Sequence, residues 1–552
     1  MVSLHFFRMT SVNPITWDNH CESFQQRPEL DTHIAYAAFA SLKQHGKRKK
    51  EWVIDHTQGR RSMDGHTLLA LAMALAKSLQ KQTDDQRIAI VLPTGIGAYI
   101  ANLACLLADR IPVNLNFTLG SEGIAHCMQL AEVSHVISAK AVKQRANNVP
   151  WEQFSTGIDL EHFFSTLSKT WLVFDLLAMR LLPTETLAKI KKIPTKGENS
   201  EATLLFTSGS AGTPKGVPLT HRNLMGNIQQ IMDEAVLLQN DRLMATLPMF
   251  HSFGCTVLLW FPLIKTIDVV CYPNPLESTQ IANVIEQEQV TVHLATPTLL
   301  RPWFKKVRPT QIKSLRAVVA GAEKTPAGFR ENWENTFGSD YLEGYGLTET
   351  TPVVSCNIPK TGKRSGSVGK LFPGMAARIL HPETRKPQPL EQRGLLALKG
   401  VNVFQGYLNN PEATQKCFLD GWFVTGDLAT IDHEGYLYIH GRLSRFSKIG
   451  GEMVAHGKVE EAITQALALE NEDAAKIAVS AREDPTRGEA IVLFTTFDLD
   501  SRTLKKKLQQ SQSELPALWM PKEIRKIEQI PLLGNGKLDL KNLNEMARRS
   551  GE

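Results

Sequence analysis

The sequence predicts an α/β protein in two parts, a large N-terminal part with mainly parallel sheets and a small, mobile α+β C-terminal domain. The chain has 552 residues, and a single hydrophobic core rarely serves more than about 250–300 residues. In the first part, short apolar runs alternate with amphipathic stretches, and this pattern changes past residue 440. Length, alternation and the late change of pattern together carry the prediction.

The first part of the chain consists of strand-like and helix-like segments in turn. Residues 87–92 (RIAIVL) form an apolar run that ends at Pro93, and an amphipathic segment and a second apolar run follow. Such alternation implies βαβ units, which place their strands in parallel sheets. On this basis we expect strands at 87–92, 111–115, 135–138, 290–295 and 315–321, and helices at 98–108, 119–131 and 278–288.

The last part of the chain has a different pattern. We expect strands at 476–481 and 489–497, joined by the turn-rich segment 483–488. Helices are expected at 458–469 and 502–510, before and after these strands. A unit of roughly 110 residues falls within the usual size of a domain. Gly450 and Gly451, near the junction, supply flexible backbone.

The composition excludes several classes of protein. Hydrophobic residues make up 42% and charged residues 21% of the chain, which excludes wholesale disorder, collagen and coiled coils. A net charge of +6 over this length is too weak to indicate nucleic-acid binding. The seven cysteines lie far apart without a CxxC pair, which suits thiols in a reducing cytosol rather than a secreted protein or a zinc site. No secretory signal is visible near the N-terminus.

Residues 163–183 are the best candidate for contact with a membrane. The segment contains Lys169, Asp175 and Arg180, whereas a spanning helix needs about 20 nearly uncharged residues. It therefore fails as a membrane span. Two alternatives remain open: a partly buried amphipathic helix, which we favour, and a helix that lies on a membrane surface.

The most informative segment is a glycine- and hydroxyl-rich loop that follows an apolar strand at 204–206. Glycines let backbone N–H groups approach an anion, hydroxyls donate to phosphate oxygens, and a lysine adds charge. The spacing differs from that of a P-loop, because Lys215 is followed by Gly216 instead of Ser or Thr. After the loop, Thr220 is expected to cap a helix with Leu224, Ile228, Ile231 and Ala235 on its apolar face. The phosphate-binding candidates are Thr207, Ser208, Gly209, Ser210, Gly212, Thr213 and Lys215.

With this loop, the sequence resembles the adenylate-forming superfamily (ANL), which comprises acyl-CoA synthetases, luciferases and peptide-synthetase adenylation domains. Further motifs follow in the order of that family, and the likeness covers nearly the whole chain from about residue 60. These motifs are Pro248-Met249-Phe250-His251-Ser252-Phe253-Gly254, Gly321-Ala322-Glu323, Gly344-Tyr345-Gly346-Leu347-Thr348-Glu349, Thr425-Gly426-Asp427, Gly441-Arg442 and Gly534-Asn535-Gly536-Lys537.

The resemblance implies a reaction in two halves. AMP is first transferred from ATP to a carboxylate with release of pyrophosphate, and the acyl group then moves to a thiol. Glu349 matches the residue that holds Mg²⁺, and Thr348 matches a contact to the α-phosphate. Lys537 matches the lysine that contacts the carboxylate and α-phosphate during adenylation. Lys448 matches the lysine of the thioester half, with an exposed lysine of no special role as the alternative.

The same resemblance assigns the nucleoside contacts. Tyr345 and Gly346 would lie against adenine, and Gly321, Ala322 and Glu323 would line the approach of adenine and the acyl group. Asp427 would accept both ribose hydroxyls, and Arg442 would hold the same region. His251 matches an aromatic gate at the acyl tunnel, and the alternative is a histidine in the hydrophobic core.

The resemblance is strongest to the acyl-ACP synthetase part of the bacterial bifunctional 2-acylglycerophosphoethanolamine acyltransferase/acyl-ACP synthetase. It rests on residues 441–454 and on Gly321-Ala322-Glu323-Lys324. It implies a fatty acid and ATP as substrates and holo-acyl carrier protein as the acceptor, with a medium- or long-chain acyl-CoA synthetase as the alternative. Peripheral contact with the inner face of the membrane is a further expectation. No histidine has an aspartate five residues later, so we expect no acyltransferase activity.

The resemblance also places the domain boundary, with an AMP- and acyl-binding domain at 1–443 and a rotating domain at 444–552. Ser444 stands where the family commonly has Asp or Lys at the pivot, and Ala211 replaces a usual Thr in the phosphate loop. Arg502, Lys505, Lys506 and Lys507 form a basic cluster that could face an acidic acceptor protein. Residues 444–552 nevertheless contain 17 basic and 17 acidic side chains, so a solvated helix face is the alternative.

Overall fold

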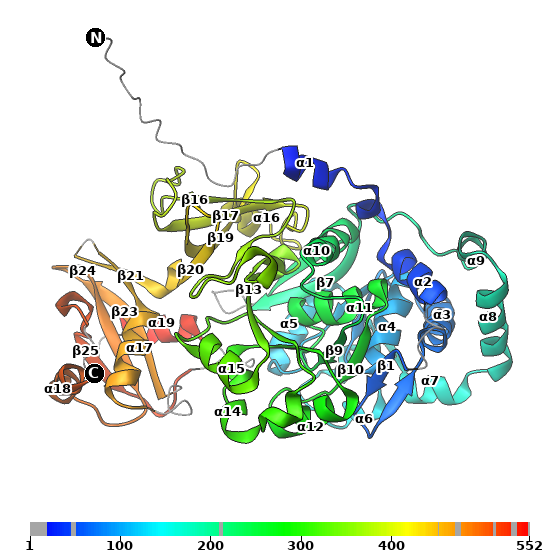
Figure 1. Cartoon of the computed structure of the whole chain (residues 1–552), viewed down its shortest axis with the longest axis horizontal. Helices are drawn as coiled ribbons and strands as arrows, with labels where there is room; N and C mark the ends of the chain where they lie inside the picture. The colour runs from blue at the N-terminus through cyan, green and yellow to red at the C-terminus, as the bar shows by residue number, and fades with distance from the viewer. Residues whose placement is uncertain are drawn as a thin grey trace, which may run out of the picture. The chain divides into compact units, whose positions relative to one another are not determined.

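The computed structural model describes residues 19–45, 51–208, 214–450, 452–469, 476–511, 515–531 and 538–549. This described chain divides into two compact units. The larger unit contains most residues before 440, and the smaller unit is built mainly from 426–429 and the described residues from 440 onward. The predicted fold class is confirmed, with mainly parallel sheets in the large part and a small α+β part at the C-terminal end (Figure 1).

The longest sheet of the larger unit has the strand order β15-β14-β13-β12-β11-β9-β10-β1-β2. From β13 to β1 every neighbouring pair is parallel, and antiparallel strands complete both edges. Such parallel strands are buried on both faces and therefore read as continuous apolar runs. The strands are β1 (Val53–Asp55), β2 (Arg61–Met63), β9 (Arg242–Ala245), β10 (Asp268–Cys271), β11 (Val292–Ala295), β12 (Ala317–Ala320), β13 (Asp340–Gly346), β14 (Val353–Cys356) and β15 (Lys370–Leu371).

A second sheet of the larger unit has the order β6-β5-β3-β4-β7-β8. Its pairs from β6 to β7 are parallel, as the strand–helix alternation predicts. The chain runs from β3 to β4 on one side and then crosses back to β5 on the other side, so the direction of the connections reverses between β3 and β5. The strands are β3 (Arg87–Ile90), β4 (Ile111–Asn114), β5 (His135–Ser138), β6 (Thr156–Asp159), β7 (Glu201–Ser208) and β8 (Pro214–Thr220).

The predicted helices of the larger unit are present, with small shifts at their ends. Thr220 caps α10 (His221–Asp233), and its hydroxyl accepts from Asn223 N at 3.0 Å. Ala235 was expected on the apolar face of this helix, but the helix ends before it and Ala235 takes a left-handed φ of 52°. Other helices are α1 (Asn19–Gln25), α2 (Ile34–His45), α3 (Gly65–Gln82), α4 (Ile96–Leu107), α5 (Ser121–Ala131), α6 (Lys140–Lys143), α11 (Phe261–Lys265), α12 (Ser278–Glu288), α13 (Pro297–Leu300), α14 (Trp303–Lys306), α15 (Phe329–Phe337) and α16 (Pro411–Cys417).

A third sheet, formed by strands within residues 375–442, was missed by the sequence analysis. It has the order β16-β17-β19-β18, and β20 pairs with β19. β16 and β17 form an antiparallel hairpin, and β18 is only two residues long. The strands are β16 (Met375–Leu380), β17 (Gly394–Gly400), β18 (Phe418–Leu419), β19 (Trp422–Ile431) and β20 (Leu437–Arg442).

The smaller unit has a sheet of order β22-β21-β24-β23, and β25 pairs with β24. The predicted hairpin is formed by β23 and β24, whose turn is held by Asp484 Oδ1 accepting from Thr486 N at 3.0 Å. The strands are β21 (Phe446–Ile449), β22 (Glu452–Ala455), β23 (Ile477–Asp484), β24 (Gly488–Thr495) and β25 (Glu523–Lys526), and the helices are α17 (His456–Ala466), α18 (Ser501–Gln510) and α19 (Leu540–Arg548).

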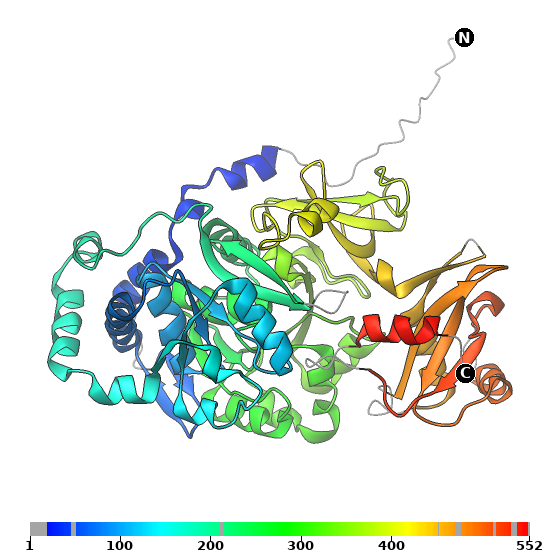
Figure 2. The ribbon, with the colours of Figure 1, turned by 180° about the vertical axis from the view of Figure 1, so that it is seen from behind.

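The segment expected as one amphipathic helix at 163–183 forms two helices. α7 (Leu160–Thr166) ends where Leu167 and Ser168 adopt extended backbone, and α8 (Lys169–Leu181) begins directly afterwards. A third helix, α9 (Thr184–Ile190), follows Pro183. Figure 2 shows the three helices along the outside of the larger unit, beside α3. Among the described helices, none is long and apolar enough to span a bilayer.

Candidate active site

The predicted phosphate loop follows the carboxyl end of β7, the edge of a parallel sheet where ligands commonly bind. β7 is anchored by buried Leu204, which pairs with Val113 of β4, and Thr203 Oγ1 donates to Pro112 O at 3.0 Å. Thr207 is half-buried near the end of β7. The predicted phosphate ligands Gly209, Ser210, Gly212 and Thr213, and the side chain of Ser208, lie outside the described residues. Lys215 lies on β8.

Tyr407 brings Lys215 and Glu349 together. The Lys215 Nζ lies 4.0 Å from the centre of the Tyr407 ring, and the Tyr407 hydroxyl donates to Glu349 Oε1 at 2.7 Å. A cation on the face of an aromatic ring is attracted by its electron density. One phenol thus contacts a cation with its ring and an anion with its hydroxyl, although these residues are far apart in the sequence.

Glu349 is fixed by its backbone as well as by Tyr407. It lies in a short 3₁₀ turn, Thr348–Thr350, and only 8% of its surface is exposed. Its carbonyl accepts from Phe404 N at 2.8 Å. The next two residues are tied to Asn402, whose Nδ2 donates to Thr350 O and whose carbonyl accepts from Thr351 Oγ1, both at 2.7 Å. The carboxylate therefore has a set position in the larger unit.

The donor set fits Mg²⁺ bound together with a substrate. Among the described residues, no group of three His, Cys, Asp or Glu side chains could hold a metal ion by itself. Mg²⁺ needs no such cage, because it commonly binds through one or two carboxylates, phosphate oxygens and waters. Glu349 supplies one buried carboxylate beside β7 and β8, the strands that flank the phosphate loop, and would hold such an ion, which would offset the negative charge of the phosphates.

The other motifs of the larger unit meet around Gly321. A Cβ added to Gly321 would lie 3.4 Å from Gly344 O and 3.6 Å from the Phe253 ring. The hydroxyls of Ser252 and Thr348 are 3.5 Å apart. Ala322 has a left-handed φ of 68°, and Glu323 is exposed, with Oε2 accepting from Thr298 N at 3.1 Å. The structure thus brings three predicted motifs to one place.

Tyr345 and Gly346 end strand β13, where it pairs with β14. Tyr345 is half-buried. A Cβ on Gly346 would lie 2.0 Å from Pro352 O, a separation that no side chain tolerates. Gly346 is therefore required by the close approach of two backbone segments, and this packing places Thr348 and Glu349 directly after the strand.

His251 is exposed, which excludes the alternative of a core histidine. Its ring lies edge-on to Phe250 at 4.7 Å, and Phe250 lies edge-on to Phe117 at 5.3 Å. His251 lies within a tight turn from Pro248 to Gly254, because a Cβ on Gly254 would lie 2.2 Å from Pro248 O. An unexpected π-helix, Gly254–Trp260, follows. The predicted gate position is thus a surface histidine at the end of an aromatic row.

Asp427 and Arg442 form an ion pair in the smaller unit. Arg442 Nε lies 2.9 Å from Asp427 Oδ1. Asp427 is 4% exposed, whereas about half of the Arg442 side chain is exposed. Gly426, with φ of 79°, makes the turn before the aspartate inside β19. The two predicted ribose contacts are therefore neighbours, and their opposite charges are already compensated.

Lys448 lies on β21 with its side chain exposed. Its backbone N–H donates to the Glu489 carboxylate. The residue before β21, Arg445, donates to Glu460 at 2.6 Å. Glu460 also accepts from Val479 N at 2.7 Å, so the start of β21 is tied to α17 and β23. Exposure suits both interpretations of Lys448. Lys537, the other predicted catalytic lysine, lies outside the described residues.

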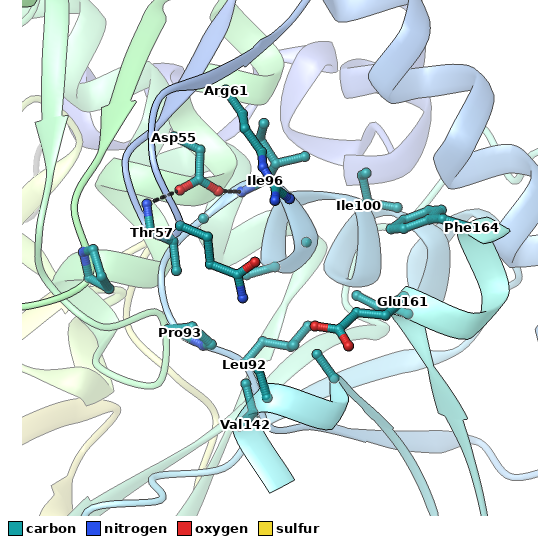
Figure 3. A pocket seen from close by; sticks show the side chains of 18 of the residues that line it. Asp55, Thr57, Arg61, Leu92, Pro93, Ile96, Ile100, Val142, Glu161 and Phe164 are labelled. Carbon is teal, nitrogen blue, oxygen red and sulfur yellow. Dashed lines mark hydrogen bonds between the residues drawn. The ribbon is translucent and has the colours of Figure 1, made fainter. Parts of the chain in front are cut away.

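Two features of the larger unit were missed by sequence reasoning. The first is Tyr407, which no local pattern connects with Lys215 or Glu349. The second is a cavity of about 710 Å³, lined by the segments after β1, β3 and β5 (Figure 3). It lies where the connections of the second sheet reverse direction, a common place for ligands. Asp55 shapes its wall, because its carboxylate accepts from Thr57 N at 2.7 Å and from Ile96 N at 2.8 Å.

The thiol near the site is unreactive. Burial, together with the nearby negative charge of Glu349, raises the pKa of Cys417 to about 11, although Lys215 acts to lower it. Only thiolates are nucleophilic, so Cys417 stays an inert thiol at neutral pH. All seven cysteines are among the described residues, and none forms a disulfide.

Comparison with known proteins agrees with this arrangement. The AMP-binding enzyme family matches residues 42–408, and the AMP-binding enzyme C-terminal domain matches residues 458–537. A long-chain-fatty-acid–CoA ligase of Bacillus subtilis is 26% identical over 87% of this chain and 89% of the relative. A sulfoacetate–CoA ligase of Cupriavidus necator is 32% identical over 64% of this chain and 68% of the relative.

Solved structures share the fold. ATP-bound MatB from Rhodopseudomonas palustris superposes with a TM-score of 0.74 at 24% identity, over 92% of this chain and 99% of that one. The o-succinylbenzoate CoA synthetase MenE of Bacillus subtilis, in complex with its acyl-adenylate, gives a TM-score of 0.77 at 22% identity, over 93% and 98%. The family matches cover both parts of the chain in the predicted order. This chain belongs to the AMP-binding enzyme family, within the adenylate-forming, acyl-CoA ligase-like superfamily.

Proposed function

We propose that this protein is an AMP-forming ligase that activates a medium- or long-chain fatty acid as acyl-AMP and transfers the acyl group to the thiol of coenzyme A. The observation that carries the proposal is the array of Lys215, Tyr407 and Glu349 beside the strands of the phosphate loop. The fatty acid and coenzyme A are supported by two relatives that align over most of this chain, the long-chain-fatty-acid–CoA ligases of Bacillus subtilis and Yersinia pestis.

The adenylation half needs charge compensation, because a carboxylate must approach the α-phosphate of ATP. Lys215 and the phosphate loop would bind the phosphates, Thr348 would donate to the α-phosphate, and Glu349 would hold Mg²⁺. Lys537 would contact both the attacking carboxylate and the α-phosphate. Preorganised donors of this kind are typically worth about 10²–10³ in rate each.

The predicted nucleoside contacts are assigned by the resemblance. Tyr345 and Gly346 would lie against adenine, with Gly321, Ala322 and Glu323 lining the approach. Asp427 would accept the two ribose hydroxyls, because an ionised carboxylate offers only acceptors. Arg442 supports this role by fixing the orientation of Asp427. His251 would stand at the entrance of the acyl group.

The thioester half would use the other lysine. We place the boundary of a rotating domain at 443/444, so that Lys448 enters the site for transfer after Lys537 has served in adenylation. Lys448→Ala should slow thioester formation while leaving ATP–pyrophosphate exchange near normal, and Lys537→Ala should do the opposite. Equal losses in both assays for both variants would contradict alternation of the domain.

Acyl carrier protein is the second candidate acceptor, and the sequence resemblance favours it. One structural observation supports it: Arg502, Lys505, Lys506 and Lys507 are all exposed on α18. A basic helix suits a small acidic protein. The relatives named as CoA ligases favour coenzyme A, which we therefore place first.

We place the reaction in the cytosol, in keeping with seven cysteines of which none forms a disulfide. The protein would contact the inner face of the membrane only peripherally.

An acceptor assay tests the proposal. The protein is incubated with ATP, Mg²⁺ and acids from octanoic to stearic acid, with either coenzyme A or holo-acyl carrier protein, and the thioesters are separated by mass. We expect acyl-CoA and AMP. Acyl-ACP without acyl-CoA would reverse the order of the two acceptors, and absence of both thioesters with every acid would contradict the proposal.

A further inference from the structure

Exposed apolar side chains gather on two neighbouring helices of the larger unit. In the described chain, seven large aliphatic or aromatic residues are strongly exposed, and five of them lie on α8 and α9. Contiguous exposed apolar surface of this kind marks a site of contact with a protein or a membrane. The five are Val173 (53% exposed), Phe174 (59%), Leu177 (44%), Leu181 (78%) and Ile190 (61%).

The four residues on α8 form one face, called here the α8 face: Val173, Phe174, Leu177 and Leu181. Their spacing of three and four residues places them on one side of the helix. The opposite side of α8 is already in use, because Leu172, Leu176 and Met179 pack on the main hydrophobic core. α8 also packs beside α3 at the outside of the larger unit (Figures 1 and 2). The helix is therefore held in place while the side chains of the α8 face stay exposed.

Positive charge borders the α8 face. Within residues 172–192, Arg180, Lys189 and Lys192 are exposed, against a single exposed acid, Glu185. Two further charges in this range compensate each other, because Lys191 forms an ion pair with Asp175 and ties the end of α9 to α8. An apolar stripe with excess cations beside it is the pattern of a helix that lies in the interface of an anionic bilayer.

The charge also argues against a second copy of this chain as the occupant. A twofold contact would place the α8 face against itself and bring the same cations together, which costs free energy. The face is also a single helix stripe, whereas a stable protein interface buries about 800 Å² on each partner. A bilayer supplies both an apolar layer for the leucines and negative headgroups for the cations.

The α8 face is connected to the cavity by α7. Leu160, Glu161 and Phe164 of α7 line the cavity of about 710 Å³, and α8 begins three residues after α7 ends (Figure 3). At another wall of the cavity, Phe117 contacts Phe250 beside His251. A protein docked through the α8 face would therefore hold this cavity close to the layer in which free fatty acids dissolve.

We propose that the α8 face, with Arg180, Lys189 and Lys192, docks this protein reversibly on anionic phospholipid bilayers. The inference rests on the proposed function only where it explains why docking would be useful, namely that fatty acids partition into bilayers. The docking itself follows from exposure and charge.

Co-sedimentation of the full chain with vesicles tests the proposal. Vesicles of phosphatidylglycerol and phosphatidylethanolamine are compared with vesicles of phosphatidylcholine alone. The double variant Leu177→Gln/Leu181→Gln should bind anionic vesicles at least about 10-fold more weakly than the wild type. The matched control is Leu238→Gln/Leu276→Gln, which removes leucines of similar exposure (40% and 76%) from other surfaces and should bind like the wild type.

Two more measurements keep the result unambiguous. The triple variant Arg180→Gln/Lys189→Gln/Lys192→Gln should lose most of its binding to anionic vesicles. The binding that remains should depend less on salt concentration than that of the wild type. Octanoate-dependent ATP–pyrophosphate exchange should be unchanged in all variants, so that loss of adenylation and loss of docking are told apart. Failure of the wild type to bind anionic vesicles would overturn the proposal. It would also be overturned if sedimentation velocity showed a dimer that Leu177→Gln/Leu181→Gln converts to a monomer.

Discussion

Glu349 in the larger unit and Asp427 in the smaller unit are both buried carboxylates, with 8% and 4% of their surface exposed, but they have different partners. Glu349 accepts a hydrogen bond from the neutral hydroxyl of Tyr407 at 2.7 Å. Asp427 forms an ion pair with the guanidinium of Arg442 at 2.9 Å. A neutral donor orients a carboxylate without cancelling its charge, whereas a guanidinium compensates it.

The difference suits the two different roles that we propose for these acidic residues. The Tyr407 hydroxyl orients Glu349 without compensating a carboxylate charge, which suits a ligand for Mg²⁺. Asp427 is already compensated and offers oriented acceptor oxygens, which suits neutral hydroxyl groups such as those of ribose. The comparison predicts that removing charge matters most at Glu349 and that removing acceptors matters most at Asp427.

The largest effect is expected for Glu349→Gln. This change keeps the shape and removes the charge, so adenylation should fall by about 10²–10³. The control is Glu343→Gln, since Glu343 is buried to a similar degree (9%) and burial raises its pKa, so that a neutral amide is a mild change. Fatty-acid-dependent ATP–pyrophosphate exchange measures both. Similar losses in the two variants would mean that packing, not charge, explains the role of Glu349.

A smaller effect, in a different kinetic constant, is expected for Asp427→Ala. Hydrogen bonds to charged groups are worth about 1.5–3 kcal/mol, so KM for ATP should rise about 10–100-fold. Asp484→Asn serves as the control, because Asp484 is another buried aspartate of the smaller unit that pairs with a partly exposed cation, Lys522. A lower kcat at an unchanged KM for ATP would count against ribose binding by Asp427.

Tyr407→Phe should reduce adenylation by about 10-fold, because one hydrogen bond to a carboxylate is lost while the aromatic ring under Lys215 remains. The requirement for Mg²⁺ should shift to higher concentration. Tyr436→Phe is a close control, since Tyr436 also carries a cation on its ring, Arg364 at 4.4 Å, and donates from its hydroxyl, to Thr361 O at 2.7 Å. An unchanged Mg²⁺ dependence in Tyr407→Phe would separate Tyr407 from metal binding.

Both units should lose stability in mild acid, because each buries a neutral histidine. Burial lowers the pKa of His221 to about 2 and that of His456 to about 3, and His221 Nδ1 accepts from Ile34 N at 3.1 Å, which requires the neutral ring. Above the unfolded pKa of about 6.5 this stability is fully present. Below it the unfolded chain binds protons and the folded chain does not, so about 1 kcal/mol per histidine is lost between about pH 7 and pH 5.5.

Thermal melts at these two pH values measure the loss. His221→Asn keeps an acceptor for Ile34 N and should melt with a smaller difference between the two pH values than the wild type. His433→Asn, at an exposed position, should melt like the wild type at both. An identical pH difference in His221→Asn and the wild type would show that other groups dominate the acid response.

The parallel sheets could be predicted from the sequence because their strands are continuous apolar runs. Residues 135–138 and 278–288 were predicted with the bounds that the structure has. The hairpin β16–β17 and its neighbours were not predicted, because β17 begins and ends at a glycine and the segment between the two strands is rich in proline and charge, which obscures a strand pattern. The break at Leu167 and Ser168 also escaped prediction, because neither residue is a strong helix breaker.

The candidate site was predicted to a similar extent. Motifs identified Lys215, Thr348, Glu349, Asp427 and Arg442, and the structure joins them into an array in the larger unit and an ion pair in the smaller one. Tyr407 was missed because it lies 58 residues from Glu349 in the sequence, and no local pattern extends over such a separation. The cavity was missed because its walls come from several loops that only the fold assembles.

The most direct test of the central claim, that Glu349 and Asp427 serve an adenylating site, is to identify the nucleotide products. The purified protein is given ATP, Mg²⁺ and a fatty acid without any thiol acceptor, and incorporation of labelled pyrophosphate into ATP is followed together with AMP and ADP. We predict exchange that depends on the fatty acid, AMP as the product and loss of both in Glu349→Gln. Formation of ADP and inorganic phosphate, or exchange that ignores the fatty acid, would contradict the claim.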